Sequence, residues 1–112
     1  MFPKTNRLPT SQFLTVLRTG TRHVSPLMQV IVLPNGLSVS RFGVIVSIHI
    51  DKRATVRNRI KRLIRESVRM LLAEIPRGYA VVIRANRNFS DRKQPSVMAD
   101  MQKLTHLPTG HL

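Results

Sequence analysis

A stretch running from Val56 to Ile75 constrains the fold more than any other part of the chain. Its apolar residues recur every three or four positions, which is the period of an α-helix with one buried face. The stripe consists of Val56, Ile60, Leu63, Ile64, Val68, Leu71, Leu72 and Ile75. Pro76 and Gly78 then end the helix, which is ~30 Å long. A continuous apolar stripe of this length predicts that the helix covers a sheet.

The strands of that sheet are predicted on both sides of the helix. Residues 28–33 are nearly all apolar and rich in β-branched residues, and Pro34-Asn35-Gly36 follows as a turn. Residues 41–50 alternate in polarity, and together with 28–33 they predict an antiparallel hairpin. The face expected on the core carries Phe42, Val44, Val46, Ile48 and Ile50. A third strand is predicted from Tyr79 to Arg84.

Short helices are predicted near both ends of the chain. The first contains Phe13, Leu14 and Leu17 and ends at Gly20 in a left-handed conformation. The last begins near Pro95 or Ser96 and buries Val97, Met101 and Leu104. Residues 1–9 and 106–112 are expected to be flexible. The order helix, strand, strand, long helix, strand, helix predicts one α+β domain over residues 1–112, with a three- to four-stranded sheet packed on one face by the long helix.

The charge of the chain identifies its class of partner. Lys and Arg number 19 against 5 Asp and Glu, which gives a net charge of +14. The repulsion among these positive charges is most directly relieved by binding a polyanion. The absence of Cys excludes disulfides and thiolate chemistry, and the four His form no i,i+4 pair of the kind that binds zinc on a helix. No apolar run approaches the ~20 residues of a membrane span, so a soluble, cytoplasmic protein is expected.

The long helix carries the densest positive charge. At 100° per residue, Asn58, Lys61, Arg62, Arg65 and Arg69 lie opposite the apolar stripe. Arg is preferred to Lys, and its planar fork donates two hydrogen bonds to a phosphate. A helix face that is merely solvated would carry charges of both signs, whereas this face is almost entirely basic. A helix lying on a membrane would insert its apolar stripe into lipid, whereas here predicted strands on both sides of the helix are available to cover the stripe. This helix is therefore predicted to bind nucleic acid.

Catalytic chemistry is not predicted for the polypeptide itself. The five acidic residues are scattered, and no paired carboxylates, Ser/His/Asp arrangement or phosphate-binding glycine loop is present. Glu66 is expected to pair with Arg62 or Arg69 within the helix.

The run from Arg57 to Glu66, Arg-Asn-Arg-Ile-Lys-Arg-Leu-Ile-Arg-Glu, closely resembles the signature segment of the bacterial ribonuclease P protein. The resemblance covers roughly residues 6 to 88. Its further matches are Asn6-Arg7-Leu8, Phe13, Arg41-Phe42-Gly43-Val44, Ala54, Gly78-Tyr79 and Arg84. It implies a fold like that of domain 2 of ribosomal protein S5.

The resemblance also implies a role and a set of partners. Proteins of this family bind a catalytic RNA that removes the 5′ leader from precursor tRNA, and the RNA with its magnesium ions performs the reaction. The implied partners are thus the catalytic RNA and precursor tRNA, in a 1:1 complex with a protein monomer, without DNA or membrane, and no cofactor or metal is bound by the protein. The implied RNA contacts are Lys52, Arg53, Arg57, Asn58, Arg59, Lys61, Arg62, Arg65 and Arg69.

A cleft between the first helix and the sheet holds the leader in such proteins. The matching residues are Phe13, Leu17, Ile31, Ile45 and Arg84. Many relatives carry aromatic residues at the positions of Leu17 and Ile31 and lysines at those of Ile48 and His49, which implies weaker or differently tuned leader binding here. The alternatives are another basic ribosomal or ribosome-assembly protein, which would use the same surface without precursor tRNA, and a binder of double-stranded DNA.

Overall fold

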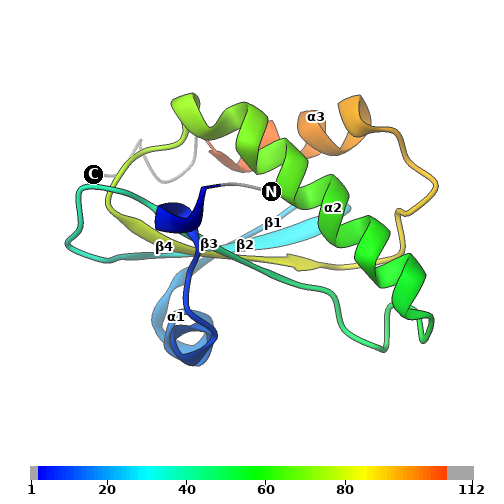
Figure 1. The fold of residues 1–112 in the computed structure, drawn as a ribbon, viewed down its shortest axis with the longest axis horizontal. Coiled ribbons are helices and arrows are strands. Elements are labelled where there is room, and N and C mark those ends of the chain that lie inside the picture. Colours follow the sequence, from blue (N-terminus) through cyan, green and yellow to red (C-terminus); the bar gives the residue numbers. More distant parts are fainter. Residues whose placement is uncertain (1–2, 106–112) are drawn as a thin grey trace.

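The computed structural model describes residues 3–105, with side chains as far as Gln102. A four-stranded sheet separates helix α1 on one face from helices α2 and α3 on the other (Figure 1). The elements are α1 (Phe13–Thr19), β1 (Thr21–Val24), β2 (Met28–Pro34), β3 (Arg41–Ile45), α2 (Ala54–Leu71), β4 (Tyr79–Ala85) and α3 (Gln94–Thr105). Short 3₁₀ turns lie at Lys4–Asn6, Thr10–Gln12 and Leu72–Glu74. The α+β class is confirmed, with helices on both faces rather than one.

The strand order β1-β2-β4-β3 contradicts the predicted hairpin. The turn at Asn35 does form, since its side chain accepts a hydrogen bond from Leu37 N (2.8 Å) and Gly36 has a φ of 70°. Strand β3 nevertheless does not pair with β2. Strand β4 lies between them, antiparallel to β2 and parallel to β3, because it is apolar on both faces and suits the centre of the sheet.

Two further strand boundaries differ from the sequence prediction. Strand β3 ends at Ile45, earlier than predicted. Val46 is still buried in the core, but Ile48 lies beyond the strand and is 62% exposed. Strand β1 was not predicted, because its four residues are mostly exposed and carry no apolar alternation. It pairs with β2 as an edge strand.

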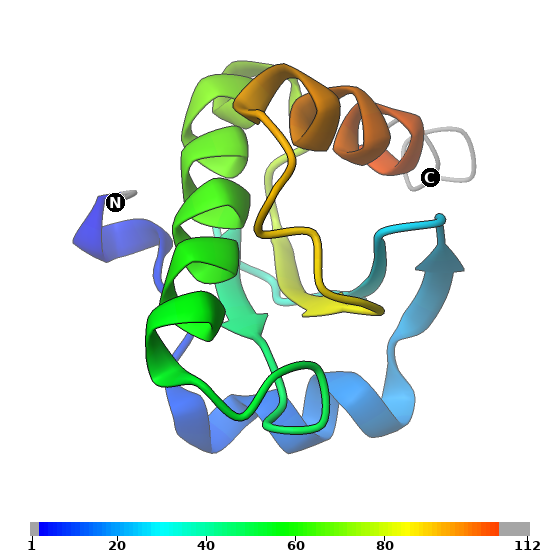
Figure 2. The same cartoon turned by 90° about the vertical axis from the view of Figure 1, so that its right-hand side faces the viewer.

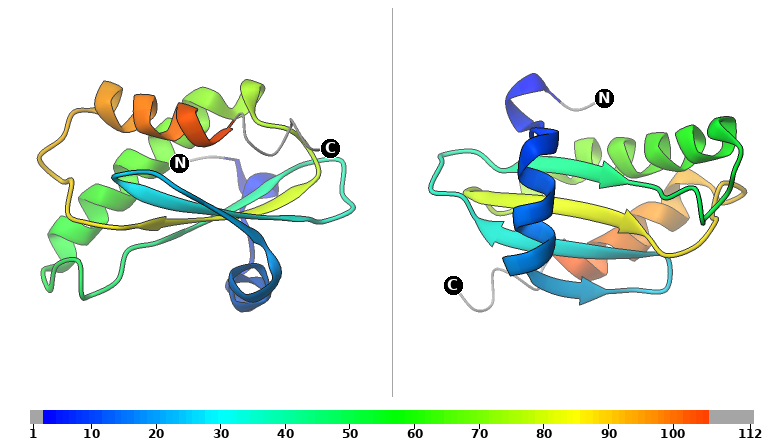
Figure 3. Two further views of the ribbon diagram at one scale, coloured as in Figure 1. Left: turned by 180° about the vertical axis from the view of Figure 1, so that it is seen from behind. Right: turned by 90° about the horizontal axis from the view of Figure 1, so that it is seen from below.

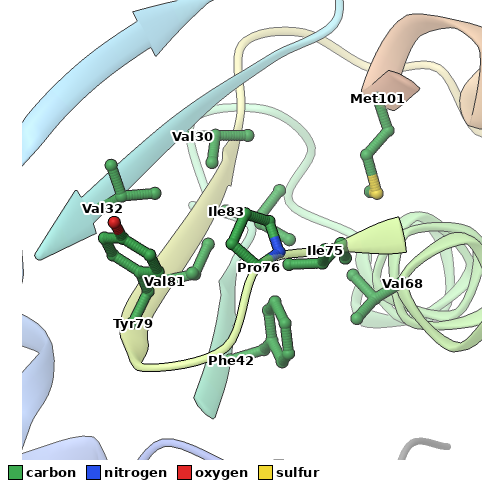
Figure 4. Close-up of a pocket in the computed structure, with 10 residues that line it drawn as sticks. All are labelled: Val30, Val32, Phe42, Val68, Ile75, Pro76, Tyr79, Val81, Ile83 and Met101. Atoms are coloured by element: carbon green, nitrogen blue, oxygen red, sulfur yellow. The ribbon is translucent and has the colours of Figure 1, made fainter. Parts of the chain in front are cut away.

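The main core lies between the sheet and helices α2 and α3. The predicted stripe of α2 is confirmed: Ile60, Ile64 and Val68 are fully buried, and Val97 and Met101 of α3 join them. A small apolar hollow of about 30 Å³ remains beside Val68 and Met101 (Figure 4). This hollow has room for little more than one or two water molecules. The outer face of α2 points away from the core and is left for other contacts.

A second, smaller core lies under α1 on the opposite face of the sheet. It contains Leu8, Val16, Ile31, Ala80 and Val82. Since Leu8 is buried and the neighbouring residue Arg7 bridges to β3, residues 7 and 8 of the segment expected to be flexible are packed on the sheet. The flexible end expected at 106–112 lies outside the described residues.

Gly20 ends α1 for a different reason from the predicted one. Its φ is −75°, so it is not left-handed. A Cβ at this position would lie 2.7 Å from the backbone oxygen of Val16 and 2.8 Å from that of Val32. Glycine therefore allows the end of α1 to lie directly against β2 where the chain turns into β1.

Candidate nucleic-acid interface

The outward face of α2 presents the predicted basic residues to solvent. Asn58, Arg62 and Arg69 are exposed, while Lys61 and Arg65 are half-buried. Asn58, Arg62, Arg65 and Glu66 line a shallow hollow on this face. Viewed from the N-terminal end of α2, the helix stands at the outer edge of its layer, with α3 on its inner side (Figure 2).

The charges at the middle of this face are not neutralised within the described structure. Among the described residues, no carboxylate forms an ion pair with Arg62, Arg65 or Lys61. Glu66 pairs instead with Arg69, as one of the two predicted alternatives, and the hydrogen bond from Arg69 lowers the pKa of the Glu66 carboxyl. Arg62 and Arg65 are therefore available for an external anion.

The arginines at the start of α2 bond within the protein. The Arg57 Nη1 atom donates to the backbone oxygens of Asp51 (3.0 Å) and Lys52 (2.8 Å). The Arg53 guanidinium donates through Nε and Nη2 to the Asp51 carboxylate (3.0 Å each). Arg59 Nε donates to the backbone oxygen of Ser90, in the loop before α3. These three residues, predicted as RNA contacts, also hold the loops around the helix start.

Sequence reasoning missed the bonds of Arg57 and Arg59 because their acceptors are backbone oxygens of loops, and a backbone oxygen leaves no sequence pattern. The sequence did contain one signal for the Asp51–Arg53 bond. An Asp side chain often accepts a hydrogen bond from the backbone N–H two residues further on, and Asp51 lies two residues before Arg53. The Arg53 backbone N–H indeed donates to Asp51 Oδ1 (2.8 Å).

The pKa of Asp51 is lowered to about 2 from 3.8, first by the Arg53 side-chain hydrogen bond and then by the Arg53 backbone N–H. We expect Arg53→Gln to raise this pKa toward 3.8, as measured by NMR titration of the carboxyl carbon. Because the folded-state pKa is the lower one, the carboxylate stabilises the fold above pH 3.8, and this contribution disappears as the pH falls through about 2. Lys52→Gln is the control, since it removes the same charge without touching Asp51. Equal shifts in both variants would contradict a direct bond.

The predicted leader residues lie on the face of the sheet that α1 partly covers. Ile31 is completely buried beneath α1, and Phe13, Leu17 and Ile45 are half-buried around the same small core. Ile31 consequently offers no surface to a ligand. Gly43 is also covered, since a Cβ on it would lie 2.3 Å from the Phe13 ring.

A partly exposed row of residues crosses all four strands beside α1. Strand register places Val24, Gln29, Arg84 and Ile45 side by side, one from each strand. The view from below shows α1 crossing one half of the sheet and leaving the half that contains this row open (Figure 3). Arg84 is exposed and Val24 is 63% exposed. Of the predicted leader residues, Arg84 and Ile45 therefore lie in the open row.

Over residues 3–105 no three His, Asp or Glu side chains gather in a way that would hold a metal ion. The same residues include no helix long and apolar enough to cross a membrane.

Comparisons with known proteins agree on one family. The family model described as Ribonuclease P matches residues 2–107. The ribonuclease P protein component of Picosynechococcus sp. is 31% identical over 103 residues, covering 91% of this chain and 89% of that protein. That of Caldanaerobacter subterraneus is 35% identical, with 85% and 81% covered. The RNase P protein from Thermotoga maritima has a TM-score of 0.80 at 27% identity, with 88% of this chain and 94% of that chain covered. The chain therefore belongs to the ribonuclease P protein family and is a component of the ribonuclease P holoenzyme.

Proposed function

We propose that this subunit binds the catalytic RNA of ribonuclease P with the outward face of α2 and holds the 5′ leader of precursor tRNA on the open half of the sheet. The observation that carries the RNA-binding role is the hollow around Arg62 and Arg65, whose guanidinium groups pair with no described carboxylate. Family membership supports the RNA as the partner.

The burial of the apolar stripe favours RNA over a membrane surface. Ile60 and Ile64 are fully buried against the sheet, so the stripe has no free area to insert into lipid. A solvated face is also disfavoured, because like charges at Arg62 and Arg65 repel each other in the free protein at a cost to the helix. Binding to phosphates removes that repulsion and releases counterions from the RNA.

The row Val24–Gln29–Arg84–Ile45 is the surface proposed for the leader. Arg84 supplies a cation for the phosphate backbone, and the apolar side chains of Val24 and Ile45 supply contact area on either side of it. The row contains no aromatic residue on which a base could stack, and stacking contributes ~1–3 kcal/mol per base in single-strand binding. We therefore expect the protein to bind the leader mainly through its phosphate backbone and with little preference for its base sequence.

In this proposal the protein contributes binding and orientation, and the RNA with its magnesium ions supplies the chemistry. The excess of 19 basic over 5 acidic residues neutralises phosphates of RNA and substrate, which repel each other when they approach. The protein acts in the cytoplasm as a monomer bound to one RNA. Family membership argues against the alternative of a basic ribosomal or ribosome-assembly protein without a role in tRNA processing.

Reconstitution with the host's own catalytic RNA tests the proposal. At a magnesium concentration too low for the RNA alone, we expect added protein to restore cleavage of precursor tRNA. Arg84→Ala should weaken binding of precursor tRNA to the holoenzyme and leave binding of leaderless tRNA unchanged. No gain in cleavage on adding the protein would overturn the proposed function. If Arg84→Ala weakened binding of precursor tRNA and leaderless tRNA equally, the leader would not bind at Arg84.

A further inference from the structure

The loop between β4 and α3, residues 86–93, is a second strongly basic segment beside α2. Arg87, Arg92 and Lys93 have exposed side chains, and Asp91 is the only acid among these residues. The loop rises from the end of β4 to the start of α3 on the side of the sheet that α2 covers (Figures 1 and 2). Its net positive charge lies next to the first turns of the basic helix.

Anchors at both ends and in the middle fix this loop in place. Asn86 Nδ2 donates to the backbone oxygen of Ser25 (2.9 Å), and Gln94 Nε2 donates to that of Leu63 in α2 (3.1 Å). Between them, Phe89 is 1% exposed and belongs to the main core. The exposed basic side chains therefore project from a backbone held at three points.

A chain of hydrogen bonds joins the loop to the start of α2. Asn88 Nδ2 donates to Asp51 Oδ2 (3.2 Å), and Asn88 Oδ1 accepts from the backbone N–H of Ser90 (2.9 Å). The Ser90 backbone oxygen in turn accepts from Arg59 Nε. Since Asp51 also bonds Arg53 and Arg57, one network holds the β4–α3 loop, the segment before α2 and the first turns of α2 together.

We propose that the β4–α3 loop is a second contact for the phosphate backbone of the RNA, held beside the basic helix by Asn88 and Arg59. The proposal rests on the proposed function and extends its surface beyond α2. Three cations against one acid on this loop favour binding of a polyanion. The loop is already ordered before binding, so little conformational entropy is lost when the contacts form. Arg59 acts here as a positioning residue as well as a cation.

A charge-matched pair of variants tests the loop as a contact. The loop variant is Arg87→Gln with Arg92→Gln and Lys93→Gln, and the control is Lys4→Gln with Arg18→Gln and Arg77→Gln, which removes three exposed charges elsewhere. Binding of the full-length protein to the catalytic RNA is measured as a function of salt. We expect the loop variant to lower the slope of log K against log salt by about two to three, and the control by less than about one.

The outcomes separate this inference from the proposed function. If Arg62→Ala with Arg65→Ala weakens binding while the loop variant behaves like its control, the loop is not a contact and the helix proposal stands. If the unaltered protein itself fails to bind the RNA, the proposed function fails first.

A second variant tests the bonds that position the loop. Asn88→Ala removes hydrogen bonds without changing charge, so we expect affinity to fall about three- to tenfold with the salt slope retained. Hydrogen exchange of the loop amides should quicken in the same variant. Unchanged affinity together with quickened exchange would show that ordering of the loop does not assist binding, and would overturn the positioning role.

Discussion

Replacing Arg62 and Arg65 together with alanine is expected to weaken binding of the catalytic RNA about 30-fold at about 0.15 M salt, because two phosphate contacts each contribute ~0.9 to the salt slope. The slope itself should fall by about two. Both guanidinium groups line the same hollow and pair with no described carboxylate, so their loss breaks no ion pair among the described residues. Filter binding across a salt series measures both quantities.

Stability provides the internal control for this experiment. Alanine is a better helix former than arginine and removes like-charge repulsion, so the free double variant should be as stable as the unaltered protein or slightly more so. Arg18→Ala with Arg77→Ala removes the same charge from exposed positions outside α2. If that pair lowered the slope by as much as the α2 pair, binding would depend on total charge and not on this face of the helix.

The second large effect is expected from Phe89→Ala, which should lower the free energy of unfolding by about 3–5 kcal/mol. Phe89 is among the largest fully buried side chains and packs in the main core, although it lies in a loop. Its removal leaves a cavity in the main core. Urea denaturation with sulfate present at a fixed concentration measures the change, since bound anions stabilise the folded state by mass action.

Phe89→Leu keeps the prediction measurable if the alanine variant does not fold. Leucine refills most of the volume, so this variant should lose less than half as much stability as the alanine variant. A loss below about 1 kcal/mol for Phe89→Ala would mean that the surroundings collapse onto the site or that the ring is not in the core.

Local patterns predicted the helices well and the sheet less well. The stripe from Val56 to Ile75 could be read directly, because the residues that define it are neighbours in sequence. The order of strands depends on pairing across long separations, and the turn at Asn35 suggested a hairpin that does not form. The signal that was overlooked is strand β4, where Ala80 and Val82 are as apolar as Val81 and Ile83. A strand apolar on both faces belongs at the centre of a sheet.

The candidate site divides in the same way. The outward position of Arg62 follows from the helical period alone, whereas the bonds of Arg57 and Arg59 depend on loops whose path the sequence does not reveal. For the leader surface, the resemblance identified Arg84 and Ile45, which lie in the open row, and also Ile31, which is buried. Strand alternation alone cannot distinguish these residues, because all three point to the same face and only the position of α1 decides which is covered.

The central position of β4 has a consequence for synthesis of the chain. Among the described elements, β3 pairs only with β4, and β4 leaves the ribosome after α2. Until Ala85 has emerged, the nascent chain carries the apolar stripe of α2 without the central strand of the sheet on which it packs. Premature termination before Tyr79 would therefore remove the middle of the sheet and not an edge, leaving β2 and β3 without the strand that joins them beneath the basic helix. The last strand to be synthesised is the one that turns the preceding segments into a binding surface.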